Sequence, residues 1–170
     1  SCIGFTASSS SFNNTGMSSI GKLSPSAGVD MESNTSEYVP RDCSFISCTF
    51  DGNSGAGLIA TGYTESVLIE NSTFKNGTSY GIDSSCRRLI GNNLSFYSNG
   101  AVGRPNINIE CSSLFNATAT LSNIYIHNAL WGGIELHKGV VVSASNLKIE
   151  DSANFGFRLV GESNIFDGII

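Results

Sequence analysis

The sequence predicts an all-β fold: a right-handed single-stranded parallel β-helix, a solenoid of about six coils. Two observations support this prediction. Two kinds of short strand recur in a fixed order along the chain, and the composition favours strands joined by tight turns. Serine (28), glycine (19) and asparagine (17) account for 64 of the 170 residues, whereas strong helix formers are scarce. A helix bundle is therefore excluded.

The first kind of strand follows a glycine, or an asparagine in its place, and returns every 23 to 29 residues. Its six copies begin at Gly28, Gly57, Gly81, Asn106, Gly133 and Gly156. The second kind has apolar residues two apart followed by Asn, Asp, Ser or Gly, and lies at 48–52, 72–76, 94–98, 124–128 and 147–151. Alternation with period two gives each segment one buried face, and copies of one motif stack in parallel about 4.8 Å apart. The crossover rule for parallel strands predicts a right-handed coil.

Differences in repeat length are expected in the turns, where segments 35–41, 101–105 and 112–118 are polar or contain proline. Residues 1–27 match the repeat poorly, and we expect an irregular first coil or an insertion there. The whole of 1–170 is expected to form a single β-helix domain. Because the chain opens without methionine and the repeat is still running at its last residues, we expect it to be part of a longer protein.

The composition also excludes several classes of function. A net charge of −5 and a pI near 4.8 argue against a nucleic-acid partner. No apolar run approaches 18 residues, so no membrane insertion is expected. The five cysteines fit neither CxxC spacing nor an even disulfide framework and indicate buried thiols, with Cys86 and Cys111 as close neighbours. Neither a metal site nor a cofactor is expected.

The register of the repeats predicts the core. Phe74 is expected in an inward stack between Phe50 and Phe96. The preceding coil is expected to place Cys43, Phe45, Phe50 and Leu58 beneath Val67, Ile69, Phe74 and Ile82.

If the first and third residues of each glycine-led strand point inward, the second and fourth point to solvent and form two columns. The second-position column is Asp30, Ile59, Asp83, Asn108, Glu135 and Arg158, and the fourth-position column is Glu32, Thr61, Ser85, Glu110, His137 and Val160. Carboxylates on neighbouring strands repel one another and have no structural need to be there. The columns therefore indicate a functional face, with a purely solvated face as the alternative.

Glycoside hydrolysis requires two carboxylates, and the columns offer two pairs. Asp30 and Glu32 lie two strand rises apart, about 6.6 to 7 Å, and Glu110 and Glu135 are diagonal neighbours at roughly 8 Å. Both spacings favour inversion. A polysaccharide lyase needs a base, an acid and a group that neutralises a uronate, and Glu135 with its neighbours His137 and Arg158 could supply them. The residues leave this choice open.

The remaining polar residues of the columns suit sugar binding: Asp83, Asn108, His137 and Arg158. Trp131, at the turn before the Glu135 strand, could stack on a sugar ring or simply fill the turn.

The repeats resemble the right-handed parallel β-helix of the pectate-lyase-like superfamily, and most closely the tailspike depolymerases of bacteriophages. Segment 28–33 is similar to the Gly-Ile-Asp-Ile-Glu-Pro motif of phage β-helix proteins, and 48–53 and 72–77 continue the likeness, which covers about 28–170. This resemblance favours Asp30 and Glu32 as the catalytic pair, because they match the motif position by position. Calcium-dependent pectate lyases combine an Asp cluster with a catalytic Arg, whereas Asp83 and Arg158 are expected three coils apart, about 14 Å, so that mechanism is doubtful here.

The resemblance implies a homotrimer on the virion tail, or otherwise a secreted protein, that binds and cleaves a bacterial surface polysaccharide, as a glycoside hydrolase rather than a lyase. Two alternatives stay open: a non-catalytic β-helical fibre or adhesin segment, and a secreted bacterial uronan lyase or epimerase.

Overall fold

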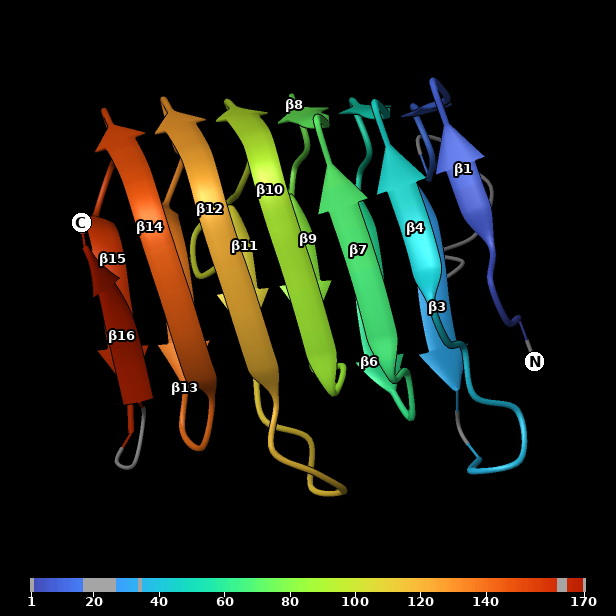
Figure 1. Cartoon of the computed structure of the whole chain (residues 1–170). Coiled ribbons are helices and arrows are strands. Elements are labelled where there is room, and N and C mark those ends of the chain that lie inside the picture. Colours follow the sequence, from blue (N-terminus) through green and yellow to red (C-terminus); the bar gives the residue numbers. More distant parts are fainter. Residues whose placement is uncertain (1, 17–26, 34, 162–164, 170) are drawn as a thin grey trace.

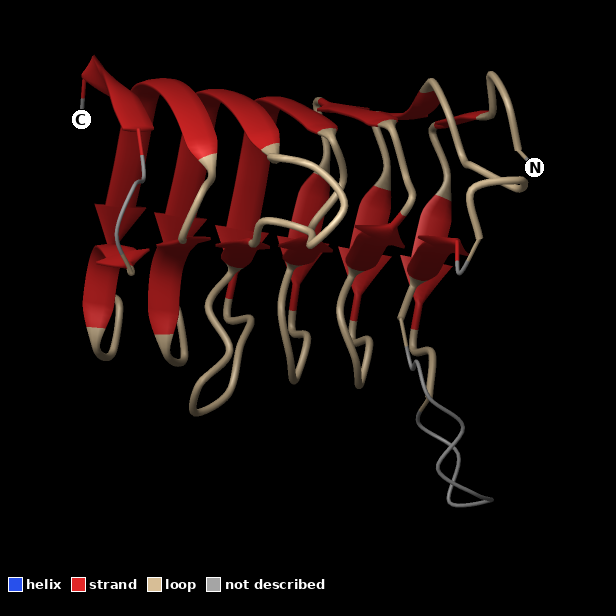
Figure 2. Cartoon of the chain, turned by 90° about the horizontal axis from the view of Figure 1, so that it is seen from below, coloured by secondary structure: helices blue, strands red, loops and turns tan. Residues whose placement is uncertain are grey.

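The computed structural model describes residues 2–16, 27–33, 35–161 and 165–169, and in these residues it contains strands, turns and loops but no helix (Figure 2). No segment of this part of the chain could therefore cross a membrane as a helix. The strands are β1 (Thr6–Ser8), β2 (Ser11–Asn13), β3 (Val29–Ser33), β4 (Cys43–Ile46), β5 (Thr49–Asp51), β6 (Leu58–Gly62), β7 (Ser66–Glu70), β8 (Thr73–Lys75), β9 (Ile82–Ser84), β10 (Arg88–Tyr97), β11 (Ile107–Ile109), β12 (Thr118–His127), β13 (Gly132–His137), β14 (Val141–Glu150), β15 (Phe155–Val160) and β16 (Ile165–Ile169).

The strands form two parallel sheets, and the chain alternates between them (Figure 1). The long sheet has the order β1-β4-β7-β10-β12-β14-β16, and β2, β5 and β8 continue the same ladder beside β10. The short sheet has the order β15-β13-β11-β9-β6-β3. Every strand pair is parallel and joins successive copies of one motif, which is consistent with a parallel β-solenoid. The predicted all-β, parallel architecture is confirmed at this level.

The apolar core contains a column of phenylalanines. The ring of Phe74 stacks on that of Phe50 at 4.4 Å and on that of Phe96 at 4.9 Å, and none of the three side chains is more than 1 % exposed. The predicted register of the neighbouring apolar residues is confirmed too, because Cys43 pairs with Val67 and Leu58 with Ile82. Strands that stack in register bring like residues together, so a single motif fills the whole core.

Two of the glycines that precede short-sheet strands lie against this phenylalanine column. A Cβ atom on Gly57 would lie 2.6 Å from the ring of Phe74, and one on Gly81 would lie 2.6 Å from the ring of Phe96. Asn106 occupies the equivalent place in the next copy, where its amide donates to the carbonyl oxygen of Gly132 at 3.2 Å. Gly57 and Gly81 thus leave room for the aromatic stack, whereas a Cβ atom on Gly28 or Gly133 would instead meet the carbonyl oxygen of Gly57 or Gly156.

Asparagines with positive φ recur at one position of the long sheet, directly after β7 and within β10, β12 and β14. Asn71, Asn93, Asn123 and Asn146 have φ values of 51°, 53°, 54° and 53°. The Asn93 amide donates to Asn71 at 2.8 Å and the Asn146 amide to Asn123 at 2.7 Å. Asn tolerates left-handed backbone better than other non-glycine residues, and stacking places the side chains in hydrogen-bonding reach.

Within the segment that matches the repeat poorly, residues 6–13 carry β1 and β2, which pair in register with β4 and β5; residues 17–26 lie outside the described residues. Cys86 is buried and accepts a hydrogen bond from the Ser84 hydroxyl, whereas the partly exposed Cys111 thiol lies 3.2 Å from the carbonyl oxygen of Phe115. Both cysteines follow the end of a short-sheet strand by two residues, because β9 ends at Ser84 and β11 at Ile109.

Candidate functional site

The candidate site lies on the outer face of the short sheet, where the second residues of the glycine-led strands form one continuous ladder. Asp30 pairs with Ile59, Ile59 with Asp83, Asp83 with Asn108, Asn108 with Glu135 and Glu135 with Arg158. The predicted second-position column is therefore present residue by residue. In the fourth-position column, Glu32 pairs with Thr61 of the neighbouring strand and His137 pairs with Val160. Ser85 and Glu110 directly follow β9 and β11 and so lie just outside these strands.

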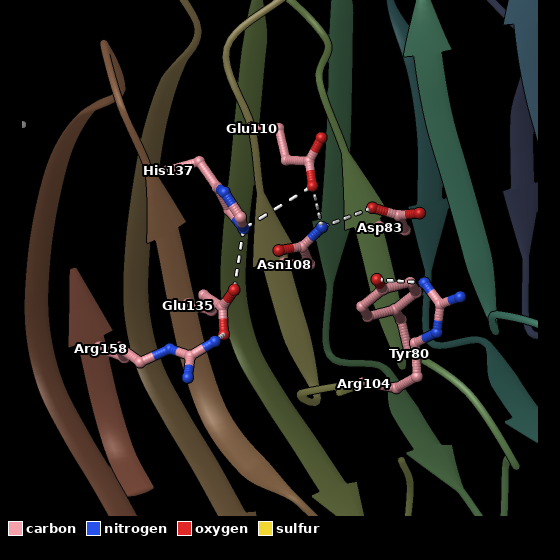
Figure 3. A network of polar contacts seen from close by, with 8 residues as sticks. All are labelled: Tyr80, Asp83, Arg104, Asn108, Glu110, Glu135, His137 and Arg158. Atoms are coloured by element: carbon pink, nitrogen blue, oxygen red, sulfur yellow. Dashed lines mark hydrogen bonds and ion pairs between the residues drawn. The ribbon is translucent and has the colours of Figure 1, made fainter. Parts of the chain in front are cut away.

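Glu135 lies at the centre of a group of charged side chains (Figure 3). One carboxylate oxygen is 2.9 Å from Nε2 of His137, and the other is 2.5 Å from the guanidinium of Arg158. Arg158 in turn lies over the ring of Phe155, at 4.6 Å. Glu135 is only 6 % exposed and Asn108 only 2 %, so the expectation that the whole column faces solvent is wrong for these two. Neighbouring side chains on the same face cover them.

Asn108 connects two other carboxylates. Its side-chain amide donates to Oδ1 of Asp83 at 2.9 Å and to Oε1 of Glu110 at 3.1 Å. Because both oxygens accept from the same nitrogen, the distance between them cannot exceed the sum of the two hydrogen-bond lengths, 2.9 Å and 3.1 Å, which is about 6.0 Å. Asp83 is partly buried and Glu110 is exposed. The Asn108 amide therefore bridges a partly buried carboxyl group and an exposed carboxylate.

His137 joins the two groups. Its Nε2 lies 3.7 Å from Oε1 of Glu110 as well as 2.9 Å from Oε1 of Glu135, so these two carboxylate oxygens are at most about 6.6 Å apart. The diagonal neighbours expected from the sequence are thus close in space. They are bridged by the imidazole and do not face an open gap.

Burial raises the pKa of Asp83 above its ordinary value of 3.8. The hydrogen bond from Asn108 opposes this shift, and the negative charge of Glu110 adds to it. A carboxyl group that is partly desolvated and next to another carboxylate holds its proton more tightly. Asp83 is therefore the member of this group best suited to act as a general acid.

Tyr80 and Arg104 complete the group, and the sequence analysis did not identify them. The guanidinium of Arg104 donates to the Tyr80 hydroxyl at 2.5 Å and lies 4.9 Å from the centre of the ring. Burial is the main cause of the raised pKa of Tyr80. Tyr80 directly precedes Gly81 and Arg104 belongs to the 101–105 loop, so neither occupies a repeat position that alternation would single out.

Asp30 and Glu32 lie apart from this group. Both are exposed on β3, the edge strand of the short sheet, and β6 with Ile59 separates them from Asp83. Partial burial and the charge of Glu32 raise the pKa of Asp30. Neither carboxylate forms an ion pair with another described residue.

Trp131 lies at the turn before the Glu135 strand, as expected, and is partly buried. Its carbonyl oxygen accepts a hydrogen bond from the backbone N–H of Asn154 at 2.8 Å, while its buried indole N–H has no acceptor among the described residues.

Within the described residues, no group of three or more His, Cys, Asp and Glu side chains is arranged to hold a metal ion. Comparison with known proteins adds no name to this site: no family model, no curated protein and no solved structure matches the chain.

Proposed function

We propose that this chain is part of a right-handed parallel β-helix of the phage tailspike kind, which binds a bacterial surface polysaccharide and hydrolyses it on the outer face of the short sheet. One observation carries the proposal: the partly buried Asp83, whose pKa is raised, shares the Asn108 amide with the exposed Glu110. Two carboxyl groups in unlike environments are what acid-assisted glycoside cleavage requires.

In this mechanism Asp83 donates its proton to the glycosidic oxygen while the Glu110 carboxylate attacks the anomeric carbon, which breaks the glycosidic bond and forms a glycosyl ester. The Asp83 carboxylate then takes a proton from water, and the resulting hydroxide displaces Glu110. The two oxygens are at most about 6.0 Å apart, which lies below the 6.5 to 9.5 Å of inverting enzymes and allows the 5 to 5.5 Å typical of retaining ones. The geometry supports retention in place of the inversion expected for the pair Glu110 and Glu135.

Glu135 has a positioning role in this proposal. Its buried carboxylate orients His137 and Arg158, and charged groups held by such contacts present their remaining N–H donors to a ligand in a fixed geometry. Tyr80 and Arg104, beside Asp83, offer a ring face and further donors for the neighbouring sugar.

The test is incubation of the natural, full-length protein with a panel of bacterial surface glycans, followed by mass analysis and anomer-resolved NMR of the products. Asp83→Asn and Glu110→Gln should each lower turnover by at least about a hundredfold, with glycan binding retained. Asp30→Asn and Glu32→Gln are matched controls on the same sheet and should cleave like the parent. Loss of turnover only in this second pair would move the site to β3.

The product ends separate the alternatives. New reducing ends that keep the anomeric configuration mean retaining hydrolysis, and unsaturated ends mean a lyase that uses Glu135, His137 and Arg158. Binding to a glycan without cleavage would establish the fibre or adhesin alternative and overturn the catalytic proposal.

A further inference from the structure

A hollow lies on the long sheet, away from the proposed cleavage site. It has a volume of about 270 Å³, and it opens where β7, β10 and β12 begin, at the lower edge of the sheet in Figure 1. Its lining residues are Asp42, Glu65, Ser66, Arg87, Arg88 and Thr118. This size suits a single small polar ligand, since sites for larger molecules enclose about 300 to 1,000 Å³.

Two arginines, Arg87 and Arg88, line the hollow, and neither forms an ion pair with an acidic side chain of the described residues. Arg88 donates to the Ser66 hydroxyl at 3.3 Å, and the guanidinium of Arg87 lies 5.6 Å from the centre of the Phe115 ring. Each side chain is therefore partly oriented before a ligand arrives. Two such guanidinium groups match the planar oxygens of a carboxylate or the oxygens of a phosphate.

Two acidic residues, Asp42 and Glu65, also line the hollow. Glu65 pairs with Arg41 at 3.5 Å, and Asp42 has a left-handed backbone with φ of 50°. Carboxylates accept hydrogen bonds from hydroxyl groups. A ligand that fills the hollow must therefore direct an anionic group to the arginines and hydroxyl groups to the acids.

We propose that this hollow binds one sugar residue that bears a carboxylate or phosphate group. The anionic group lies against Arg87 and Arg88, and the sugar hydroxyls donate to Asp42 and Glu65. The site is independent of the proposed cleavage at Asp83 and Glu110, because the two share no residue and lie on different sheets.

The test is titration of the isotope-labelled chain with glucuronate, glucose 6-phosphate, glucose and glucosamine, followed by amide NMR. Glucuronate or glucose 6-phosphate should give saturable shifts at Ser66, Arg88 and Thr118, and glucose should bind much more weakly. Arg88→Gln should weaken binding of the anionic sugar about tenfold or more, because it removes a charge-assisted hydrogen bond. Arg88→Lys keeps the charge but not the bidentate geometry and should give an intermediate loss.

Lys148→Gln is the matched control, since it removes an exposed cation from the long sheet outside the hollow. It should leave the affinity unchanged. Asp42→Asn should weaken binding of the anionic sugar less than Arg88→Gln does, because it replaces the charged acceptor of a sugar hydroxyl with a neutral amide oxygen. Absence of saturable shifts with either anionic sugar, or equal affinity in the parent and Arg88→Gln, would overturn the proposal. So would preferential binding of glucosamine that is lost in Asp42→Asn.

Discussion

At the scale of single residues, Asp83 connects site chemistry to stability. Its pKa in the folded protein is raised above 3.8, mainly by burial, so the folded state binds this proton more tightly than the unfolded chain does. The free energy of unfolding should therefore fall as the pH rises from about 3.8 through the raised pKa, and then level off.

The first prediction is that Asp83→Asn removes this contribution and makes the protein more stable than the parent at neutral pH. Urea denaturation of both proteins at a series of pH values measures it. The difference between the free energies of unfolding of the two proteins, plotted against pH, gives the contribution of Asp83 alone. Other carboxyl groups whose pKa is raised, such as Asp30, contribute equally to both proteins and cancel. A difference that stays constant across this pH range would contradict the prediction.

The second prediction concerns the buried carboxylate of Glu135. Glu135→Gln should cost about 1 to 3 kcal/mol, because it removes the charged partner of His137 and Arg158. Glu110→Gln, at a largely exposed carboxylate, should cost less. Urea midpoints of the parent and both variants at one pH measure these costs, and a Glu135→Gln midpoint equal to that of the parent would show that the ion pairs of Glu135 contribute no stability.

At the scale of the elements, the aromatic stack holds the two sheets together. Phe74→Ala should cost about 3 to 5 kcal/mol, because it leaves a cavity between the rings of Phe50 and Phe96. Tyr97→Ala is the control, since this ring lies on the outer face of the long sheet against Tyr125. It should lower the midpoint of denaturation far less, and a Phe74→Ala protein as stable as the parent would place the stack outside the core.

The glycine before each short-sheet strand yields a further prediction at this scale. A Cβ atom on Gly81 would lie 2.6 Å from the ring of Phe96 and 2.9 Å from the carbonyl oxygen of Asn106, whereas one on Gly156 would meet its nearest atom at 3.7 Å. Gly81→Ala should therefore cost about 1 to 3 kcal/mol through overpacking, and Gly156→Ala should cost little. Thermal melts of the two variants compare the same substitution at equivalent repeat positions.

At the scale of the whole molecule, the parallel sheets run through every described copy of the repeat (Figure 1), and each strand contacts mainly its neighbours in the stack. Such a solenoid leaves broad side faces available for a second chain. If the chain is of the tailspike kind, as we propose, the natural, full-length protein should be a homotrimer. Light scattering of that protein should give three times the mass of one chain, and a monomer mass would contradict the expectation.

Much of the architecture could be predicted from the sequence. The period-two alternation identified the strands, and the recurrence of one motif predicted the partners of Phe74 and the ladder from Asp30 to Arg158. This works because parallel stacking places each residue beside its counterpart in the next copy. A register set by repetition needs no knowledge of distant contacts.

The tertiary structure alone decided how the site is assembled. It buried Asn108 and Glu135, placed His137 between two carboxylates, and brought the unrepeated residues Tyr80 and Arg104 beside Asp83. Alternation predicts which face of a strand a side chain leaves from. Whether that side chain is then solvated depends on the neighbouring side chains and on the loops at the sheet corners, and these vary from copy to copy because the repeat does not constrain them.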